Sequence, residues 1–205
     1  MAIAVGTKKM PRAERERLIL DAATRLFAED GFGATSLAGI AAAAGITKPL
    51  VHSYFGPKEA LFEACLARAS ENIEQHVRTR IVDVPQDISM AYAVLDAVFT
   101  ALEPRPHDWA LLHEVVVPAD SAAADSLHRH RRRVVTLAID GIRDLARTMN
   151  LTDPADIDAA TQVWLSALSA LVRWWLAHPD NTAQDMLLRS ERVFVGFGRL
   201  GRERR

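Results

Sequence analysis

Residues 41–55 read AAAAGITKPLVHSYF, and this stretch decides how the N-terminal part of the chain folds. Four alanines favour a helix, yet Gly45 interrupts it and a second short segment begins at once. Glycine adopts a left-handed backbone at little cost, so it commonly ends one helix and redirects the chain. The stretch therefore predicts two short helices, near 36–44 and 48–55, joined by a tight turn.

The spacing of small and apolar residues around this turn is typical of a helix-turn-helix. If the motif begins at Leu37, Ala41 falls where the two helices cross and only a small side chain fits. Gly45 then lies in the turn, and Val51 packs against the first helix from the second. An ordinary helical hairpin with a solvated polar face is the alternative interpretation of the same spacing.

The second helix of the motif carries polar side chains that suit DNA. Thr47 stands at its N-cap and a proline follows in the first turn, where the backbone needs no N–H donor. Lysine, histidine and tyrosine donate hydrogen bonds to phosphate oxygens, and a helix of this size fits the major groove. The outward-facing candidates for DNA contact are Lys48, Pro49, His52, Ser53 and Tyr54.

Residues 15–64 resemble the DNA-binding head of the TetR family of bacterial transcriptional regulators. The features that match, at the family's spacing, are AA..LFAEDGF, TSL..IA..AGI, YF and KEALF. The resemblance implies that Thr35 caps the second helix of the head and reaches a phosphate. It also implies that Thr47 and Lys48 contact the DNA backbone, with Lys48 near the floor of the groove. Tyr54 and Lys58 are implied to contact DNA phosphates.

Three positions depart from the family pattern. Pro49 stands where many members have glycine, Leu50 where the residue is often polar, and His52 where tyrosine is usual. These changes leave the mode of docking unaltered and bear on which bases are preferred.

Beyond the head, glycines and prolines separate segments of helical period, and strand signals are almost absent. We expect an all-α fold with an N-terminal three-helix DNA-binding head. The resemblance implies a C-terminal helical domain for effector binding and dimerisation, which places the domains at 1–56, including an N-terminal arm, and 57–205. The predicted helices cover 11–30, 36–44, 48–55, 57 to beyond 73, 87–102, 107–117, 122–149, 154–178 and 183–200.

The segments 154–178 and 183–200 carry apolar residues at alternating spacings of four and three, the rhythm of a helix–helix contact. Because the family resemblance implies a dimer, we expect these helices to form the interface of a homodimer. The alternative is that both helices line one subunit's own core. The predicted interface residues are Ile157, Thr161, Trp164, Leu168, Leu171, Trp175, Val193 and Phe197.

The resemblance also implies a small-molecule effector, which we expect to be apolar or aromatic. Candidates for lining its cavity are Met90, Phe99, Trp109 and His113, all in the middle helices. Aromatic residues at such positions also occur as plain core, which is the alternative.

Composition narrows the class of protein. The chain has 205 residues, 49% of them hydrophobic, and a net charge of −1, so any basic surface must be local. Cys65, the single cysteine, excludes an intramolecular disulfide and fits a reducing compartment. The first residues lack the apolar run of a signal peptide, and no segment has the length of a membrane span. We expect a cytoplasmic protein with no membrane association.

Catalytic and cofactor motifs are missing from the sequence. His113 and Glu114 begin like a zinc-protease helix, but the second histidine would stand at Val117. We find no nucleophile motif and no phosphate-binding glycine loop, so we expect neither an enzyme nor a metal or cofactor site.

The sequence thus predicts a sequence-specific transcriptional regulator of double-stranded DNA. We expect a repressor that binds a palindromic operator as a homodimer and is released by its effector. Two alternatives stay open: a helical enzyme or metal-binding protein without a role on DNA, and a DNA-binding scaffold that senses no ligand.

Overall fold

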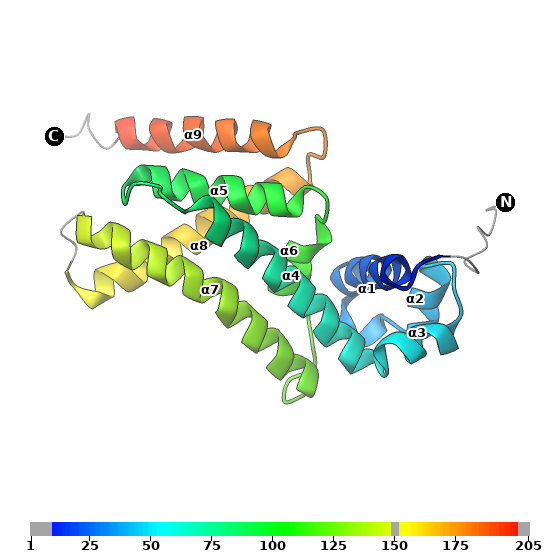
Figure 1. Cartoon of the computed structure of the whole chain (residues 1–205). Coiled ribbons are helices and arrows are strands. Elements are labelled where there is room, and N and C mark those ends of the chain that lie inside the picture. The colour runs from blue at the N-terminus through cyan, green and yellow to red at the C-terminus, as the bar shows by residue number, and fades with distance from the viewer. Residues whose placement is uncertain (1–9, 149–151, 201–205) are drawn as a thin grey trace. The chain divides into compact units, whose positions relative to one another are not determined.

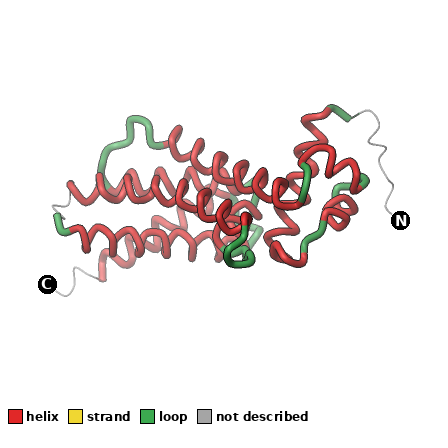
Figure 2. The backbone as a smooth tube through the Cα atoms, turned by 90° about the horizontal axis from the view of Figure 1, so that it is seen from below, coloured by secondary structure: helices red, strands yellow, loops and turns green. Residues whose placement is uncertain are grey.

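The computed structural model describes residues 10–148 and 152–200, and every regular element within these ranges is an α-helix (Figures 1 and 2). The all-α prediction is therefore confirmed. The described helices are α1 (Arg12–Ala34), α2 (Leu37–Ala43), α3 (Lys48–Phe55), α4 (Lys58–Arg80), α5 (Ile88–Leu102), α6 (His107–His113), α7 (Ala122–Thr148), α8 (Pro154–Leu176) and α9 (Ala183–Leu200). Within the described ranges, no helix is long and apolar enough to cross a membrane.

Most helix bounds fall within a few residues of those predicted, and two differ for identifiable reasons. α1 extends past the expected end at residue 30, but its backbone breaks at Gly31, where φ is +80°. α6 ends at His113 instead of residue 117. Three consecutive valines disfavour the helix there, and Pro118 biases the residue before it toward an extended backbone.

The chain forms two compact units. The first comprises Met1–Glu71 and His107–Arg132, and the second comprises Asn72–Pro106 and Arg133–Arg205. α6 and the beginning of α7 thus belong to the same compact unit as the helix-turn-helix. A single boundary after residue 56 would separate them from it. The functional division into 1–56 and 57–205 stays a prediction.

The first unit is built around buried aromatic and aliphatic side chains from α1 and α4. The Phe62 ring of α4 meets Phe27 and Phe32 of α1 edge to face, with centroids 4.9 Å and 5.0 Å apart. Such aromatic contacts add to the stabilisation from apolar burial. The backbone N–H of Phe32 donates to the carbonyl of Val116, so the loop after α6 is tied to the end of α1.

In the second unit α5 lies alongside α9, and α8 packs against α9 as well (Figure 1). Phe99 of α5 and Trp175 of α8 meet edge to face, with centroids 5.4 Å apart. At one end of this unit the carboxylate of Glu103 accepts a hydrogen bond of 2.8 Å from the backbone N–H of Ala183, the first residue of α9. That contact supplies an acceptor for an N–H group that has no partner within its own helix.

Candidate nucleic-acid interface

α2 and α3 form the helix-turn-helix that the spacing predicted. Ile40, Ala41 and Val51 are buried where the two helices meet. Gly45 in the turn has φ of +67°, a conformation that favours glycine. The N–H of Ile46 donates to the carbonyl of Ala41 at 2.9 Å, so the first helix ends with its carbonyl paired.

The start of α3 presents an exposed polar face. Thr47 occupies the N-cap position with an extended backbone, but its side chain makes no capping hydrogen bond. Lys48 is exposed and has no side-chain hydrogen bond or ion pair with any described residue. A cation in this state keeps all three of its donors for a ligand. Pro49, His52 and Ser53 are exposed on the same helix.

At two positions this face of α3 does not offer a free hydrogen-bond donor: Ser53, whose hydroxyl proton is already used, and Leu50, which is apolar. The Ser53 hydroxyl donates to the carbonyl of Leu50 at 2.8 Å, one turn back along the helix. The hydroxyl oxygen remains able to accept a hydrogen bond. Leu50 is half-buried, so it packs in part against the head and in part faces outward.

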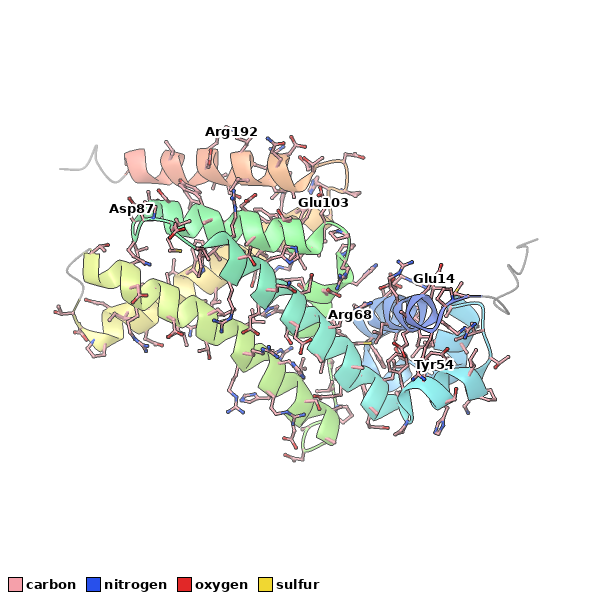
Figure 3. The ribbon with its side chains drawn as sticks, in the orientation of Figure 1. Glu14, Tyr54, Arg68, Asp87, Glu103 and Arg192 are labelled. Atoms are coloured by element: carbon pink, nitrogen blue, oxygen red, sulfur yellow. The ribbon has the colours of Figure 1, made fainter. Side chains whose placement is uncertain are left out.

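Tyr54 is half-buried near the end of α3 and contacts the start of α1 (Figure 3). Its hydroxyl accepts a hydrogen bond of 2.8 Å from Nη1 of Arg15. The guanidinium of Arg12 lies over the Tyr54 ring, 5.2 Å from the centroid. Neither arginine was selected from the sequence, because residues this far apart in the chain, 39 positions for Arg15 and Tyr54, leave no signal in the local spacing.

Thr35 does not cap α2 as expected. The N-cap is Ser36, whose side-chain oxygen accepts a hydrogen bond of 3.1 Å from the N–H of Gly39. Thr35 is 4% exposed, and its hydroxyl donates to the carbonyls of Gly31 and Leu26 at 2.8 and 3.1 Å. These hydrogen bonds fasten Thr35 to the end of α1, and its buried side chain offers little surface to a phosphate.

Lys58, at the first position of α4, is also engaged inside the head. Its ammonium donates to the carbonyls of Phe32 and Thr35 at 2.9 and 3.1 Å. It also lies over the Phe32 ring, 4.2 Å from the centroid. Two of its three donors are therefore committed to the segment between α1 and α2, and the phosphate contact that the resemblance implied stays a prediction.

The four expected effector residues divide between the two units. Met90 and Phe99 are buried in α5 of the second unit. Trp109 and His113 lie one turn apart on α6 of the first unit, with their rings stacked at a centroid distance of 4.1 Å. Trp109 is 2% exposed. Burial, together with the positive charge of Arg131, lowers the pKa of His113 to about 4, so this histidine is neutral near pH 7.

The expected dimer residues of α8 prove to face the subunit's own core in part. Thr161, Leu168 and Trp175 are buried within the single chain, whereas Ile157, Trp164 and Leu171 are only half-buried. On α9 Val193 is exposed, and the side chain of Phe197 lies outside the described part of the chain.

A second apolar face of these helices, which the predicted interface does not include, is exposed. Val163 of α8 is 69% exposed, and Trp174, three turns further along the same face, is 38% exposed. On α9 Leu188 and Val195 are exposed as well. One subunit therefore covers the side of α8 marked by the spacings of four and three only in part, and its place in a dimer interface stays a prediction.

The described residues contain no group of three or more His, Cys, Asp or Glu side chains placed to hold a metal ion. Cys65 is buried, and burial raises the pKa of its thiol to about 12. A thiol in this state is a poor nucleophile and a poor metal ligand.

Comparison with known proteins agrees with this geometry. Residues 19–65, which include the whole helix-turn-helix, match the family described as bacterial regulatory proteins, tetR family. The chain is 28% identical over 177 residues to the HTH-type transcriptional activator FasR of Mycolicibacterium smegmatis, a match that covers 75% of this chain and 81% of that protein.

Two solved structures share the fold across both units. AibR, solved in complex with isovaleryl coenzyme A and operator DNA, is 22% identical, with a TM-score of 0.66 and coverage of 84% of this chain and 94% of that one. FadR of Bacillus subtilis, solved in complex with stearoyl-CoA, is 17% identical, with a TM-score of 0.65 and coverage of 86% and 94%. The matched head and the related regulator lead to one conclusion: the chain is a DNA-binding transcriptional regulator whose helix-turn-helix head, residues 19–65, is of the type found in the tetR family of bacterial regulatory proteins.

Proposed function

We propose that the protein represses transcription as a homodimer bound to a palindromic operator, and that a small acyl-bearing effector releases it. The observation that carries the proposal is the exposed polar face at the start of α3, directly after the tight turn at Gly45. Two such helices, related by a two-fold axis, would enter successive major grooves at half-sites roughly 10 bp apart.

We propose that Thr47, Lys48, Pro49, His52 and Ser53 face the groove and that Tyr54 binds a phosphate. Lys48 supports this assignment, because it is exposed and its donors are uncommitted among the described residues. His52 supplies either a donor or an acceptor to a base edge, depending on its tautomer. Thr35 and Lys58 are left out of this set, since their polar atoms are used within the head.

For the dimer we propose the exposed face of α8 and α9. Val163 and Trp174 on α8, with Leu188, Val193 and Val195 on α9, present apolar side chains to solvent in the single chain. Covering such a surface is favourable by about 25 cal/mol for each Å² of apolar area removed from water. Two helices from each subunit would then form a four-helix interface.

For the effector we propose an acyl thioester, supported by the two related folds that were solved with acyl-coenzyme A molecules. The Nε1 of Trp109 and the Nε2 of His113 are buried and have no hydrogen-bond partner among the described residues. A buried donor without an acceptor costs free energy, and a ligand carbonyl near Trp109 would supply one. Met90 and Phe99 stay candidates for apolar lining in the second unit.

The direction of regulation has a second candidate, because the related FasR is named an activator. A reporter gene placed behind the operator separates the two. Deletion of the regulator raises reporter expression if the protein represses and lowers it if the protein activates.

The test of the whole proposal begins with the DNA that the full-length protein selects from a random duplex pool. We expect a palindrome, and we expect stearoyl-coenzyme A or isovaleryl-coenzyme A to weaken binding by about 5- to 150-fold, the usual range of allosteric coupling. Selection of no common sequence would contradict the operator. Equal affinity with and without either compound would contradict the acyl thioester as effector while leaving the DNA assignment intact.

A further inference from the structure

The contact between Arg15 and Tyr54 joins the first turn of α1 to the end of α3. Nη1 of Arg15 donates to the Tyr54 hydroxyl at 2.8 Å, and Nη2 donates to the backbone carbonyl of Met10 at 3.1 Å. The guanidinium is thus held from two sides, and Arg15 is itself half-buried. A planar fork fixed in this way holds its partner in one orientation.

The direction of the proton on Tyr54 follows from the chemistry of the two groups. A guanidinium only donates hydrogen bonds, so the phenol oxygen is the acceptor in its bond with Arg15. The phenol O–H is then left to donate to another acceptor. Phosphate oxygens carry no hydrogen and only accept, which makes a DNA phosphate a suitable partner for that proton.

The cations around the ring differ in what they contribute. Arg12 lies nearer the ring, with its guanidinium 5.2 Å from the centroid, but its Nε is paired with Glu16 at 2.9 Å and the side chain is largely exposed. Arg15 lies 6.0 Å from the centroid and touches the hydroxyl itself. Of the two, Arg15 is therefore the residue that sets where the hydroxyl points.

We propose that Arg15 is a positioning residue for DNA binding, which acts by orienting the Tyr54 hydroxyl toward a phosphate of the operator. The inference rests on the proposed phosphate contact of Tyr54. Arg15 also joins the N-terminal segment, through the Met10 carbonyl, to the far end of the DNA-contacting helix. Arg15 therefore contributes to affinity through the two hydrogen bonds of its guanidinium, to Tyr54 and to Met10, and not through its charge alone.

The experiment compares four full-length proteins on the operator selected from a random duplex pool: the natural chain, Arg15→Lys, Tyr54→Phe and the double variant. Lysine keeps the charge but cannot reproduce the two-armed contact with Tyr54 and Met10. Arg25→Lys is the matched control, since Arg25 lies on the same helix and pairs with Glu29 at 3.1 Å. Thermal unfolding of each variant verifies that the head is folded at the temperature of the binding measurement, and Arg15→Gln serves as a second, uncharged variant.

We expect Tyr54→Phe to weaken operator binding about 10-fold, Arg15→Lys to weaken it about 5- to 10-fold, and the double variant to bind as Tyr54→Phe does, because the two residues act as one unit. Arg25→Lys should change affinity less than about 2-fold. If Arg15→Lys costs the same factor in both backgrounds, or costs nothing, Arg15 does not act through Tyr54 and the inference is overturned. If Tyr54→Phe binds as tightly as the natural chain, the proposed phosphate contact fails as well.

Discussion

The carboxylate of Glu63 on α4 lies 3.0 Å from Nε2 of His130 on α7, and the other ring nitrogen of His130 lies 2.8 Å from the Ser70 hydroxyl. An ionised carboxylate only accepts hydrogen bonds, so Nε2 of His130 carries the proton that faces Glu63. Ser70 is fully buried, and Arg129 adds an ion pair to the same carboxylate at 3.1 Å. These contacts hold α4 against α7 within the first unit.

We predict that Glu63→Gln makes the protein less sensitive to acid. Burial raises the pKa of Glu63, but hydrogen bonds from Ser126 and His130, with the charges of His130 and Arg129, outweigh burial and leave the pKa lowered. A carboxyl group with a lowered pKa in the folded state stabilises the fold above its unfolded pKa, and that contribution is lost as the pH falls through the folded pKa.

The measurement is the free energy of unfolding from about pH 7 down to about pH 3. The natural chain should lose more stability over this range than Glu63→Gln does, and the two should converge at the acid end. Glu59→Gln, an exposed position in the first turn of the same helix, is the control and should follow the natural chain. Parallel curves for the natural chain and Glu63→Gln would rule out the role assigned to this carboxylate.

A second pH dependence is expected from His113. Its pKa is lowered to about 4 by burial and by the charge of Arg131. The imidazole therefore takes up a proton at a lower pH in the folded state than in the unfolded chain. Stability should therefore fall as the pH drops from about 6.5 toward about 4, by on the order of 3 kcal/mol in total.

His113→Phe keeps an aromatic ring against Trp109 and removes the titrating group, so this part of the acid-induced loss should disappear. The direct measurement is the pH titration of the His113 ring signals by NMR. A midpoint near 6.5 for those signals would show that His113 is not held neutral by its surroundings.

Two lysines of the head should behave oppositely when each is replaced by methionine. Lys58→Met leaves the carbonyls of Phe32 and Thr35 without their donor, which should lower the free energy of unfolding by about 1–3 kcal/mol. Lys48→Met should leave unfolding almost unchanged and weaken operator binding by about 1–3 kcal/mol, since its side chain is exposed and contacts no described acceptor.

Chemical denaturation and operator titration, both applied to both variants, decide this comparison. A normal unfolding midpoint for Lys58→Met, combined with weaker binding to all sequences and a smaller salt dependence, would restore Lys58 as a phosphate contact.

For the proposed dimer, the two faces of α8 give a matched pair of substitutions. Val163→Glu adds a charge to an exposed apolar face, so it should yield a folded monomer that loses operator affinity. Leu168→Ala opens a cavity in the subunit's own core and should cost about 2–5 kcal/mol of folding stability.

Analytical ultracentrifugation gives the assembly state, and circular dichroism during heating gives the stability. An intact dimer for Val163→Glu would place the interface elsewhere. A fully stable Leu168→Ala variant would show that Leu168 is not part of the packed core.

Local sequence determined the helix-turn-helix. The spacing of Ala41, Gly45 and Val51 reflects steric demands that lie within a few residues of one another, and the structure confirms all three positions. Helix bounds were predictable for the same reason, since capping and helix-breaking residues act over one or two turns. Periodicity alone predicted that α6 continues to residue 117, but the helix ends at His113, because the three valines before Pro118 disfavour it.

Tertiary structure decided which residues each apolar helix face packs against and which partners each polar side chain bonds. Periodicity showed that α8 has apolar faces, but whether the chain's own helices or a second subunit cover Leu168 depends on packing between segments far apart in the sequence. Lys58 and Thr35 were predicted to contact phosphate because a resemblance carries residue types and not hydrogen-bond partners. The carbonyls that accept hydrogen bonds from Lys58 and Thr35 reach these side chains only when the helices of the head pack. The same holds for the hydrogen bond from the Arg15 guanidinium to Tyr54. A hydrogen bond depends on the distance and angle between its two groups in space, which local spacing in the sequence does not encode.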